Sequence, residues 1–319
     1  MGIWLNGIMG VVTGDALGCP VEFSDRNEMD ASPVEGMEGY GTFHLPEGSW
    51  TDDSSMTLAA LDSIREKKTI DPADIMSRFA LWLQKGEYTP FGRSFDIGGG
   101  CYQAILNFLR NPELGPAWGG SDEWDNGNGS LMRIMPACLY CYLEEKAGRM
   151  TEKEAVRQIH LVSGLTHNHL RAKTACGLYF FMTREILDGE GNLTGRLQQG
   201  MNRGFIFYEK DLENAGQLSY FKRLRNLTEL QQMSRENIRS SGYVIDTMEA
   251  AVWSLITTGS LKEALLLAVN LGGDTDTVAA IAGGIAGLYY GYEEIPDDWR
   301  KVIQRRIWIE RMCREMDLN

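Results

Sequence analysis

The stretch Leu271-Gly-Gly-Asp-Thr-Asp-Thr-Val278 places two carboxylates, Asp274 and Asp276, directly before a run of small apolar residues at 279–287. That run predicts a buried helix that packs closely against a neighbour, and such a helix gives no reason for acids at its start. One acid at a helix start is an ordinary N-cap. A second buried acid is costly unless a cation or a hydrogen-bond donor compensates it. The stretch by itself leaves two interpretations open: a cap with a surface acid, or part of a metal site.

Length and composition indicate a globular protein that does not bind nucleic acid. The chain has 319 residues, of which 43% are hydrophobic and 24% charged, and its formal net charge is −13. An acidic chain is a poor binder of a phosphate backbone, although a bound metal can still attract a small anion. We find no signal peptide and no run of about 18 apolar residues. We therefore expect a cytoplasmic, reduced protein without a membrane segment.

Apolar residues recur at helical spacing along most of the chain, and glycines cluster between these segments. No alternating strand pattern, repeat or linker divides the sequence, so we predict one all-α domain over residues 1–319. The predicted helices are Trp4–Thr13, Thr57–Glu66, Pro72–Lys85, Cys101–Arg110, Leu131–Lys146, Glu152–Leu165, Leu170–Leu187, Thr247–Thr257, Ser260–Asn270, 275–290, and one amphipathic helix after Pro296 with Ile303 and Ile307 on its apolar side.

A second segment, Thr51-Asp52-Asp53, also presents hydroxyl and carboxylate oxygens at a predicted helix start. A cap uses one of these side chains and does not need all three. Together with residues 274–277 the segment suits a hard cation such as Mg²⁺ or Mn²⁺, or a pair of such ions about 3.5–4 Å apart. Glu22 offers one more carboxylate. Zinc is disfavoured, because histidine is rare and Cys138-x-x-Cys141 has no second pair.

Two glycine-rich loops precede predicted helices. Asp96-Ile-Gly-Gly-Gly100 exposes backbone N–H groups that could bind a phosphate, but it matches no nucleotide motif and an ordinary flexible loop explains it as well. Asn128-Gly-Ser130 could cap the helix after it. We expect Arg133, among apolar neighbours, to be partly buried and paired with an acid. His167 lies at a helix junction, and its local sequence by itself predicts a structural role.

Six segments, taken in order, resemble the motifs of ADP-ribosylglycohydrolases, including the bacterial branch that contains the dinitrogenase reductase activating glycohydrolase. They are Gly14-Asp-Ala-Leu-Gly-x-Pro-x-Glu22, Trp50-Thr-Asp-Asp-Ser54, Asp96-Ile-Gly98, Gly127-Asn-Gly-Ser-Leu-Met-Arg133, Thr166-His167 and Gly272-Gly-Asp-Thr-Asp-Thr277. The resemblance covers nearly the whole chain. It implies a multi-helical orthogonal bundle with a binuclear Mg²⁺ or Mn²⁺ centre at helix N-termini, on the floor of a cleft.

The resemblance also implies roles for individual residues. The implied metal ligands are Thr51, Asp52, Asp53, Asp274, Asp276 and Thr277. The implied catalytic carboxylates are Glu22, beside the metals, and Asp96, which faces the ligand. The implied ligand contacts are Gly98, Gly99 and Gly100 as a phosphate loop, Asn128, Gly129, Ser130 and Met132 along the cleft, His167 near the diphosphate, and Tyr243 packed on the ligand. Cys101 stands where many relatives of the bacterial branch carry a hydroxyl residue.

The function implied by this resemblance is the removal of ADP-ribose from a modified protein side chain, with arginine as the favoured attachment. Three alternatives remain open at this point: a hydrolase of another ADP-ribose conjugate, O-linked or small-molecule; an ADP-ribose-binding module without turnover; and another metal-dependent hydrolase, such as a phosphoesterase. The expected partner is an ADP-ribosylated protein or small molecule. The sequence does not indicate the oligomeric state.

Overall fold

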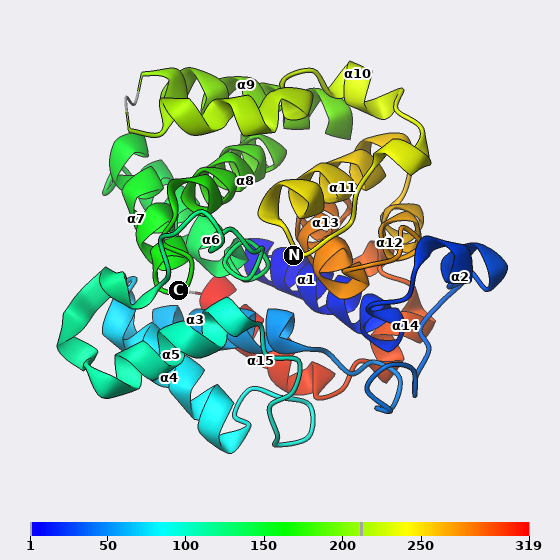
Figure 1. Cartoon of the computed structure of the whole chain (residues 1–319), viewed down its shortest axis with the longest axis horizontal. Helices are drawn as coiled ribbons and strands as arrows, with labels where there is room; N and C mark the ends of the chain where they lie inside the picture. The colour runs from blue at the N-terminus through cyan, green and yellow to red at the C-terminus, as the bar shows by residue number, and fades with distance from the viewer. Residues whose placement is uncertain (1, 211–212, 319) are drawn as a thin grey trace.

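The computed structural model describes residues 2–210 and 213–318, and within them it contains helices and no β-strand (Figure 1). The predicted all-α fold is confirmed. The α-helices are α1 (Ile3–Gly18), α2 (Arg26–Ala31), α3 (Asp52–Lys67), α4 (Pro72–Lys85), α5 (Gly99–Arg110), α6 (Met135–Lys146), α7 (Glu152–Gly164), α8 (Leu170–Asp188), α9 (Leu193–Glu209), α10 (Leu227–Gln231), α11 (Val244–Thr257), α12 (Leu261–Val269), α13 (Thr275–Tyr290), α14 (Asp297–Val302) and α15 (Arg306–Asp317). The 3₁₀ helices are η1 (Cys19–Val21), η2 (Pro112–Trp118), η3 (Ala215–Arg225), η4 (Arg235–Asn237) and η5 (Tyr292–Glu294).

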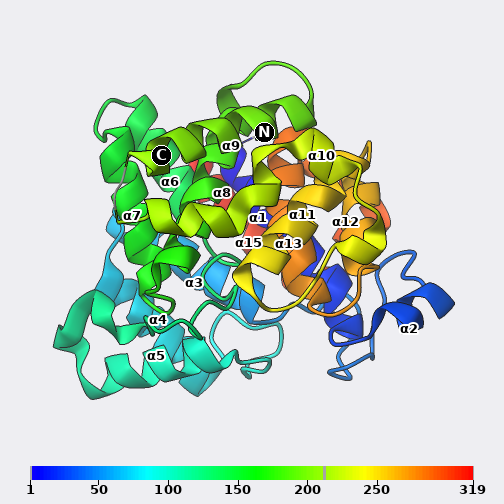
Figure 2. The ribbon, with the colours of Figure 1, turned by 45° about the horizontal axis from the view of Figure 1, so that its top comes forward.

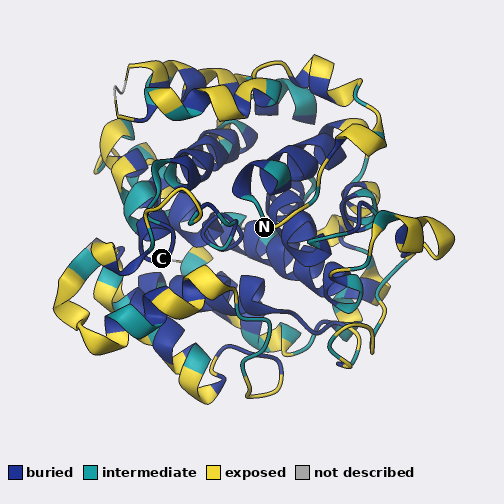
Figure 3. Cartoon of the chain, in the orientation of Figure 1, coloured by how far each residue is buried: buried dark blue, intermediate teal, exposed yellow. Residues whose placement is uncertain are grey.

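Helices α1 and α13 lie in the middle of the molecule, with α9 and α10 along one side and α4 and α5 along the opposite side (Figures 1 and 2). Colouring by burial shows these two central helices almost wholly buried, whereas α2, α5 and α9 each expose one face (Figure 3). No helix in the described ranges has the length and apolarity needed to cross a membrane. The core therefore surrounds the α1–α13 pair, and the site is built on the ends of that pair.

Small residues allow α1 and α13 to touch through their backbones, as the apolar run after Asp276 predicts. A Cβ atom on Gly10 would lie 2.1 Å from the carbonyl oxygen of Gly283, and one on Gly14 would lie 2.0 Å from that of Ala279. The Thr275 hydroxyl then donates to the carbonyl of Gly18, at the end of α1, over 2.8 Å. These contacts fix the acidic start of α13 against the end of α1.

Several predicted helices differ from the structure. Helix α1 continues past Thr13 to Gly18, and α3 begins at Asp52 and not at Thr57. The helix predicted from Leu131 begins at Met135, because Pro136 has no N–H and is compatible only with the first turn. The single helix predicted after Pro296 is divided into α14 and α15, and Ile307 is 75% exposed rather than apolar-facing. Between the two helices Arg305 has a left-handed φ of 49°. Its guanidinium donates to the carbonyl of Thr89 over 2.8 Å, a tertiary contact that accompanies the break.

Candidate active site

The start of α3 is held by a residue of α1 that sequence reasoning missed. Asp15 is fully buried, and its Oδ1 accepts hydrogen bonds from the backbone N–H of Thr51 over 2.9 Å and from the Thr51 hydroxyl over 3.0 Å. Its Oδ2 accepts from the backbone N–H and the hydroxyl of Ser54. Asp15 therefore satisfies N–H groups of the first turn, a task usually left to a local cap. Asp52 and Asp53 are left free to line a cleft.

At the start of α13, the side chain of Asp274 does not cap the helix. Asp274 occupies the N-cap position but makes no side-chain capping hydrogen bond. Its carboxylate instead accepts from the side-chain amide of Asn128 over 2.7 Å. The loop before it is tied down by Gly273, whose φ is 76° and whose N–H donates to the carbonyl of Ser24. The carboxylate is therefore positioned by tertiary contacts and not by its own helix.

The two acidic helix starts meet, although about 225 residues separate them. Thr51 Oγ1 lies 3.1 Å from Asp276 Oδ2, so its single proton is shared between this carboxylate and that of Asp15. The Thr277 hydroxyl donates to Asp53 Oδ1 over 3.3 Å. Carboxylate oxygens of Glu22, Asp274 and Asp276 lie within 4.8 Å of one another. The six residues predicted as metal ligands are therefore brought into one cluster, with Glu22 beside it.

This cluster forms the floor of a cavity of about 340 Å³. The predicted site residues that line it are Glu22, Asp52, Asp53, Asp96, Gly98, Gly99, Gly100, Asn128, Gly129, Met132, His167, Asp274 and Thr277. Phe23 also lines it and was not predicted; this aromatic side chain is 67% exposed, at a left-handed φ of 68°. Thr51, Asp276 and Ser130 are buried and are not among the lining residues.

The carboxylates of this cluster are buried and repel one another, and no cationic side chain that lines the described cleft balances their charge. Among its described lining residues the cleft contains no lysine and no arginine. Burial, followed by the charge of Asp96, raises the pKa of Glu22 to about 10, and burial raises the pKa of Asp96 to about 6. Burial and neighbouring carboxylates also raise the pKa of Asp53 and of Asp276 well above its ordinary value. Each of these shifts is what a bound cation would reverse.

The donor set suits a hard divalent cation. Three buried carboxylate oxygens of this cluster have no hydrogen-bond partner among the described residues: Glu22 Oε2, Asp53 Oδ2 and Asp276 Oδ1. Mg²⁺ and Mn²⁺ prefer carboxylate and hydroxyl oxygens, and both kinds are present here. The side chains of Cys138 and Cys141 are buried and free, and no histidine is in the acidic cluster. The residues present therefore fit a magnesium or manganese site better than a zinc site.

The glycine-rich loops also line the cleft. The Gly98 backbone N–H donates to the Asp52 carboxylate, which connects the first loop to the acidic cluster. Added Cβ atoms on Gly98 and Gly99 would meet nothing within 4 Å, so both residues border open space. A Cβ on Gly100 would lie 3.0 Å from His167 Nε2. His167 is thus not only a structural junction residue, because its ring packs beneath the loop and lines the cleft.

Arg133 departs from its predicted environment. It is fully buried, not partly, and no acid pairs with it in the described structure. Its Nη2 donates to the Thr166 hydroxyl over 2.7 Å and to the carbonyl of Val162 over 3.3 Å. Its Cζ atom lies 4.8 Å from the ring centroid of Phe79. A buried guanidinium is therefore retained beside the cleft without a neutralising carboxylate.

Tyr243 lines a neighbouring pocket of about 530 Å³, which shares Gly127 and Gly242 with the acidic cleft. Its hydroxyl accepts from Arg171 Nη1 over 3.1 Å. The Arg171 guanidinium also stacks 3.5 Å from the ring centroid of Tyr220. Sequence reasoning missed Arg171, because nothing near it along the chain signals contacts made by residues 49 and 72 positions later.

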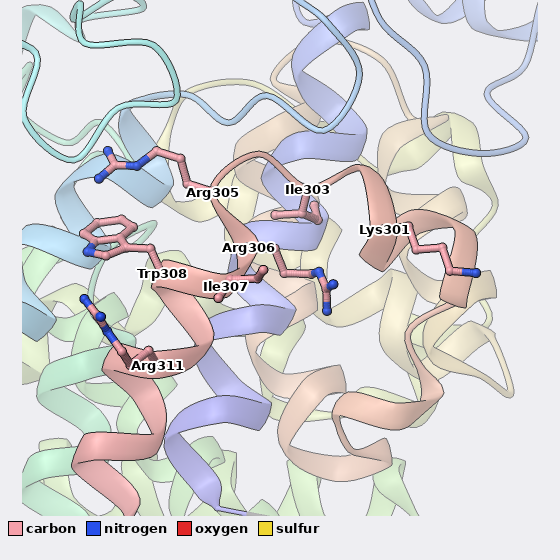
Figure 4. A pocket seen from close by; sticks show the side chains of 7 residues that line it. All are labelled: Lys301, Ile303, Arg305, Arg306, Ile307, Trp308 and Arg311. Carbon is pink, nitrogen blue, oxygen red and sulfur yellow. The ribbon is translucent and has the colours of Figure 1, made fainter.

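A separate pocket of about 510 Å³ lies around the break between α14 and α15 (Figure 4). It is lined by Lys301, Ile303, Arg305, Arg306, Ile307, Trp308 and Arg311. Arg305 stacks 4.0 Å from the ring centroid of Trp308. These side chains offer no oxygen ligand for a metal, and the one amine among them, that of Lys301, is ion-paired with Asp297. The acidic cleft is therefore the candidate active site.

Comparisons with known proteins agree with this geometry. The family model described as ADP-ribosylglycohydrolase matches residues 4–319. An ADP-ribosylarginine hydrolase Tri1 of Pseudomonas putida (strain GB-1) is 34% identical over 97% of this chain and 76% of its own length. The ADP-ribosyl-(dinitrogen reductase) glycohydrolase of Rhodospirillum rubrum is 30% identical over 95% of this chain and 90% of its own.

A solved structure described as an ADP-ribosylglycohydrolase-related protein complex has the same fold. It matches with a TM-score of 0.76 and 27% sequence identity, over 99% of this chain and 97% of that chain. The family model matches nearly all residues of the chain. The two relatives named above are at least 30% identical to it over most of their length. The protein therefore belongs to the ADP-ribosylglycohydrolase family.

Proposed function

We propose that this protein is a metal-dependent hydrolase that removes ADP-ribose from a modified arginine side chain by cleaving the N-glycosidic bond. The observation that carries the proposal is the meeting of two acidic helix starts in a cleft whose described lining has no cationic side chain. Relatives from Pseudomonas putida and Serratia proteamaculans, 34% and 33% identical, are named ADP-ribosylarginine hydrolases. These names favour arginine over other attachment points. The substrate is then an ADP-ribosylated protein or an ADP-ribosyl small molecule.

We propose a centre of two Mg²⁺ or Mn²⁺ ions. Its ligands are Thr51, Asp52, Asp53, Asp274, Asp276 and Thr277. The buried, partnerless oxygens of Asp53 and Asp276 support this assignment, as do the raised pKa values of Asp52, Asp53 and Asp276. When bound, such a pair supplies positive charge for the vicinal ribose hydroxyls and lowers the pKa of a bound water.

Glu22 and Asp96 are the proposed acid–base groups. Their side chains are hydrogen-bonded to each other, and in the metal-free cleft the pKa of Glu22, about 10, lies above that of Asp96, about 6, so a proton shared by the pair resides on Glu22 there. In the reaction, a water oxygen bonds to the anomeric carbon as the carbon–nitrogen bond breaks. One carboxylate accepts a proton from the water, and the departing guanidine nitrogen gains a proton. A nearby carboxylate also stabilises the positive charge that develops on the ribose.

The remaining wall of the cleft is proposed to bind the ligand. Gly98, Gly99 and Gly100 form the proposed phosphate loop, and the open space around the first two supports this role. The other proposed contacts are Asn128, Gly129, Ser130, Met132, His167 and Tyr243. We further propose that residues 1–319 act as one domain in the cytoplasm, which fits the six free cysteines.

The proposal is tested with ADP-ribosyl-arginine, and ADP-ribosyl-serine serves as the matched substrate. The protein is stripped of metal with a chelator and then supplied with Mg²⁺ or Mn²⁺, and free ADP-ribose is measured by chromatography. We expect release from the arginine conjugate only after metal is restored. Tight binding of ADP-ribose without release under any condition would contradict the hydrolase assignment and identify a binding module. Faster release from the serine conjugate would contradict the proposed linkage.

A further inference from the structure

The buried Arg133 is connected to the cleft through two residues, Thr166 and His167. The diphosphate of ADP-ribose is anionic, yet the lining described above contains no lysine or arginine. Arg133 is a buried cation near this cleft, and its Nε and Nη1 atoms have no hydrogen-bond partner in the described structure. Retaining a buried guanidinium without a carboxylate is costly. The hydrogen bonds that Arg133 does make therefore indicate its role.

A hydrogen-bonded chain leads from Arg133 to His167. Arg133 Nη2 lies 2.7 Å from Thr166 Oγ1, and Thr166 Oγ1 lies 2.8 Å from His167 Nδ1. A guanidinium can only donate, so the Thr166 oxygen accepts from it. The single hydroxyl proton of Thr166 is then available to one acceptor. If it goes to His167 Nδ1, the proton of the neutral imidazole must be on Nε2.

The other neighbour of the Thr166 hydroxyl is Cys101, which is a weaker acceptor. The Cys101 thiol is buried, and burial raises its pKa to about 12, so it stays protonated. Its Sγ lies 3.9 Å from the carbonyl oxygen of Gly129, to which it can donate. Neutral sulfur accepts hydrogen bonds poorly, whereas an imidazole nitrogen accepts them well. The hydroxyl proton of Thr166 is therefore directed to His167 Nδ1.

The Nε2 side of His167 is directed toward the glycine-rich wall of the cleft. It lies 3.0 Å from the position that a Cβ on Gly100 would take, and 3.3 Å from the corresponding positions on Gly127 and Gly129. No hydrogen bond from Nε2 to another described residue occurs, whereas Nδ1 is engaged by Thr166. The backbone N–H of His167 donates to the carbonyl of Ser163 over 2.9 Å, which fixes the residue.

We propose that Arg133 and Thr166 are positioning residues that hold His167 in the neutral tautomer protonated at Nε2, so that it presents an N–H group to an anionic oxygen in the cleft. The identity of that oxygen, in the ADP-ribose diphosphate, rests on the proposed function. Burial and the charge of Arg133 lower the pKa of His167 to about 3, which keeps the ring neutral at physiological pH. The cleft thereby gains a donor that does not titrate between pH 5 and 8.

The tautomer can be measured directly and without any ligand. The protein is labelled with ¹⁵N-histidine, and long-range ¹H–¹⁵N correlation spectra identify which nitrogen of each ring carries the proton. The chain has four histidines, and the signals of His167 are assigned from the spectrum of His167→Gln. We expect protonation at Nε2 and a hydrogen-bonded acceptor at Nδ1 from pH 5 to 8. A proton on Nδ1, or a ring that becomes charged in this range, would overturn the proposal whether or not ADP-ribosyl-arginine is the substrate.

Variants of Thr166 then test the consequence for binding. Thr166→Val keeps the shape and removes the hydroxyl, and Thr166→Ser keeps the hydroxyl as the matched control. With ADP-ribose as the probe, we expect the Kd of the valine variant to rise about tenfold, with its Nδ1 signal shifted to that of a free acceptor. The serine variant should bind within about twofold of the unmodified protein. Equal affinity and an unchanged Nδ1 signal in a folded valine variant would refute the role of Thr166.

Discussion

Two glycine-to-alanine substitutions on the same wall of the cleft are expected to have opposite effects on stability. A Cβ on Gly129 would lie 2.8 Å from His167 Cε1 and 2.9 Å from Cys101 Sγ, and both neighbours are buried. Such distances force a shift of packed atoms, and overpacking of this kind costs about 1–3 kcal/mol. A Cβ on Gly99, in the first turn of α5, would meet nothing within 4 Å. There alanine restricts the unfolded chain and stabilises by about 0.5 kcal/mol.

The expected changes are measurable by thermal and urea unfolding. A chain of 319 residues has an unfolding entropy of roughly 0.7 kcal/mol/K. Gly129→Ala should therefore lower the Tm by about 2–4 °C, and Gly99→Ala should leave the Tm unchanged or raise it by about 1 °C. Because Gly99 borders the open cleft, its alanine variant should still weaken ADP-ribose binding, which isothermal titration measures. Neither Gly99 nor Gly129 has a left-handed φ, so backbone strain does not contribute to the expected change in stability.

The opposite ranking would refute this reasoning. If Gly99→Ala were the less stable of the two, the loop would not border open space as the structure has it. If Gly129→Ala kept both the Tm and the affinity, the packing of His167 against this glycine would not constrain the cleft. Unchanged affinity in the Gly99 variant alone would remove that residue from the proposed phosphate loop.

Three further predictions concern the acidic cluster. Asp276→Asn replaces a proposed metal ligand with a neutral side chain of the same size, so the metal-free protein should stay folded while turnover and the rise in Tm with Mn²⁺ are lost; a folded variant with full activity would exclude the two-metal centre. Burial raises the pKa of Asp96 from 3.8 to about 6, so the folded state retains its proton more strongly than the unfolded state. The stability of the metal-free protein should therefore fall as the pH rises from about 4 to 6, which differential scanning fluorimetry with a chelator measures; stability that rises over this window would contradict the shift. Metal at a hundredfold excess over its Kd should stabilise the protein by about 2.7 kcal/mol, or roughly 4 °C in Tm, and the gain should shrink as the pH is lowered; a Tm indifferent to both metal and chelator would argue against a metal site.

Local sequence determined most of the helices and the chemical nature of the site. The N-caps at Asp71 and Ser260 accept hydrogen bonds from N–H groups two or three residues onward, so their signals are contained within a few positions of the sequence. The small residues after Asp276 likewise predicted a helix that packs closely against a neighbour, and the structure shows that this neighbour is α1. Such features depend on neighbours along the chain, and they can be predicted from it.

Tertiary structure decided which polar side chains cap a helix and which remain free. Asp274 has the position of a cap, yet its carboxylate accepts from Asn128, which lies 146 residues earlier. Asp15 caps the first turn of α3 although it belongs to a different helix, α1. Arg133 was expected to pair with an acid, and it donates to the Thr166 hydroxyl instead. A hydrogen bond depends on distance and angle and is indifferent to separation along the chain. The acids themselves were therefore visible in the sequence, whereas the partner of each one was settled only when α1, α3 and α13 packed together.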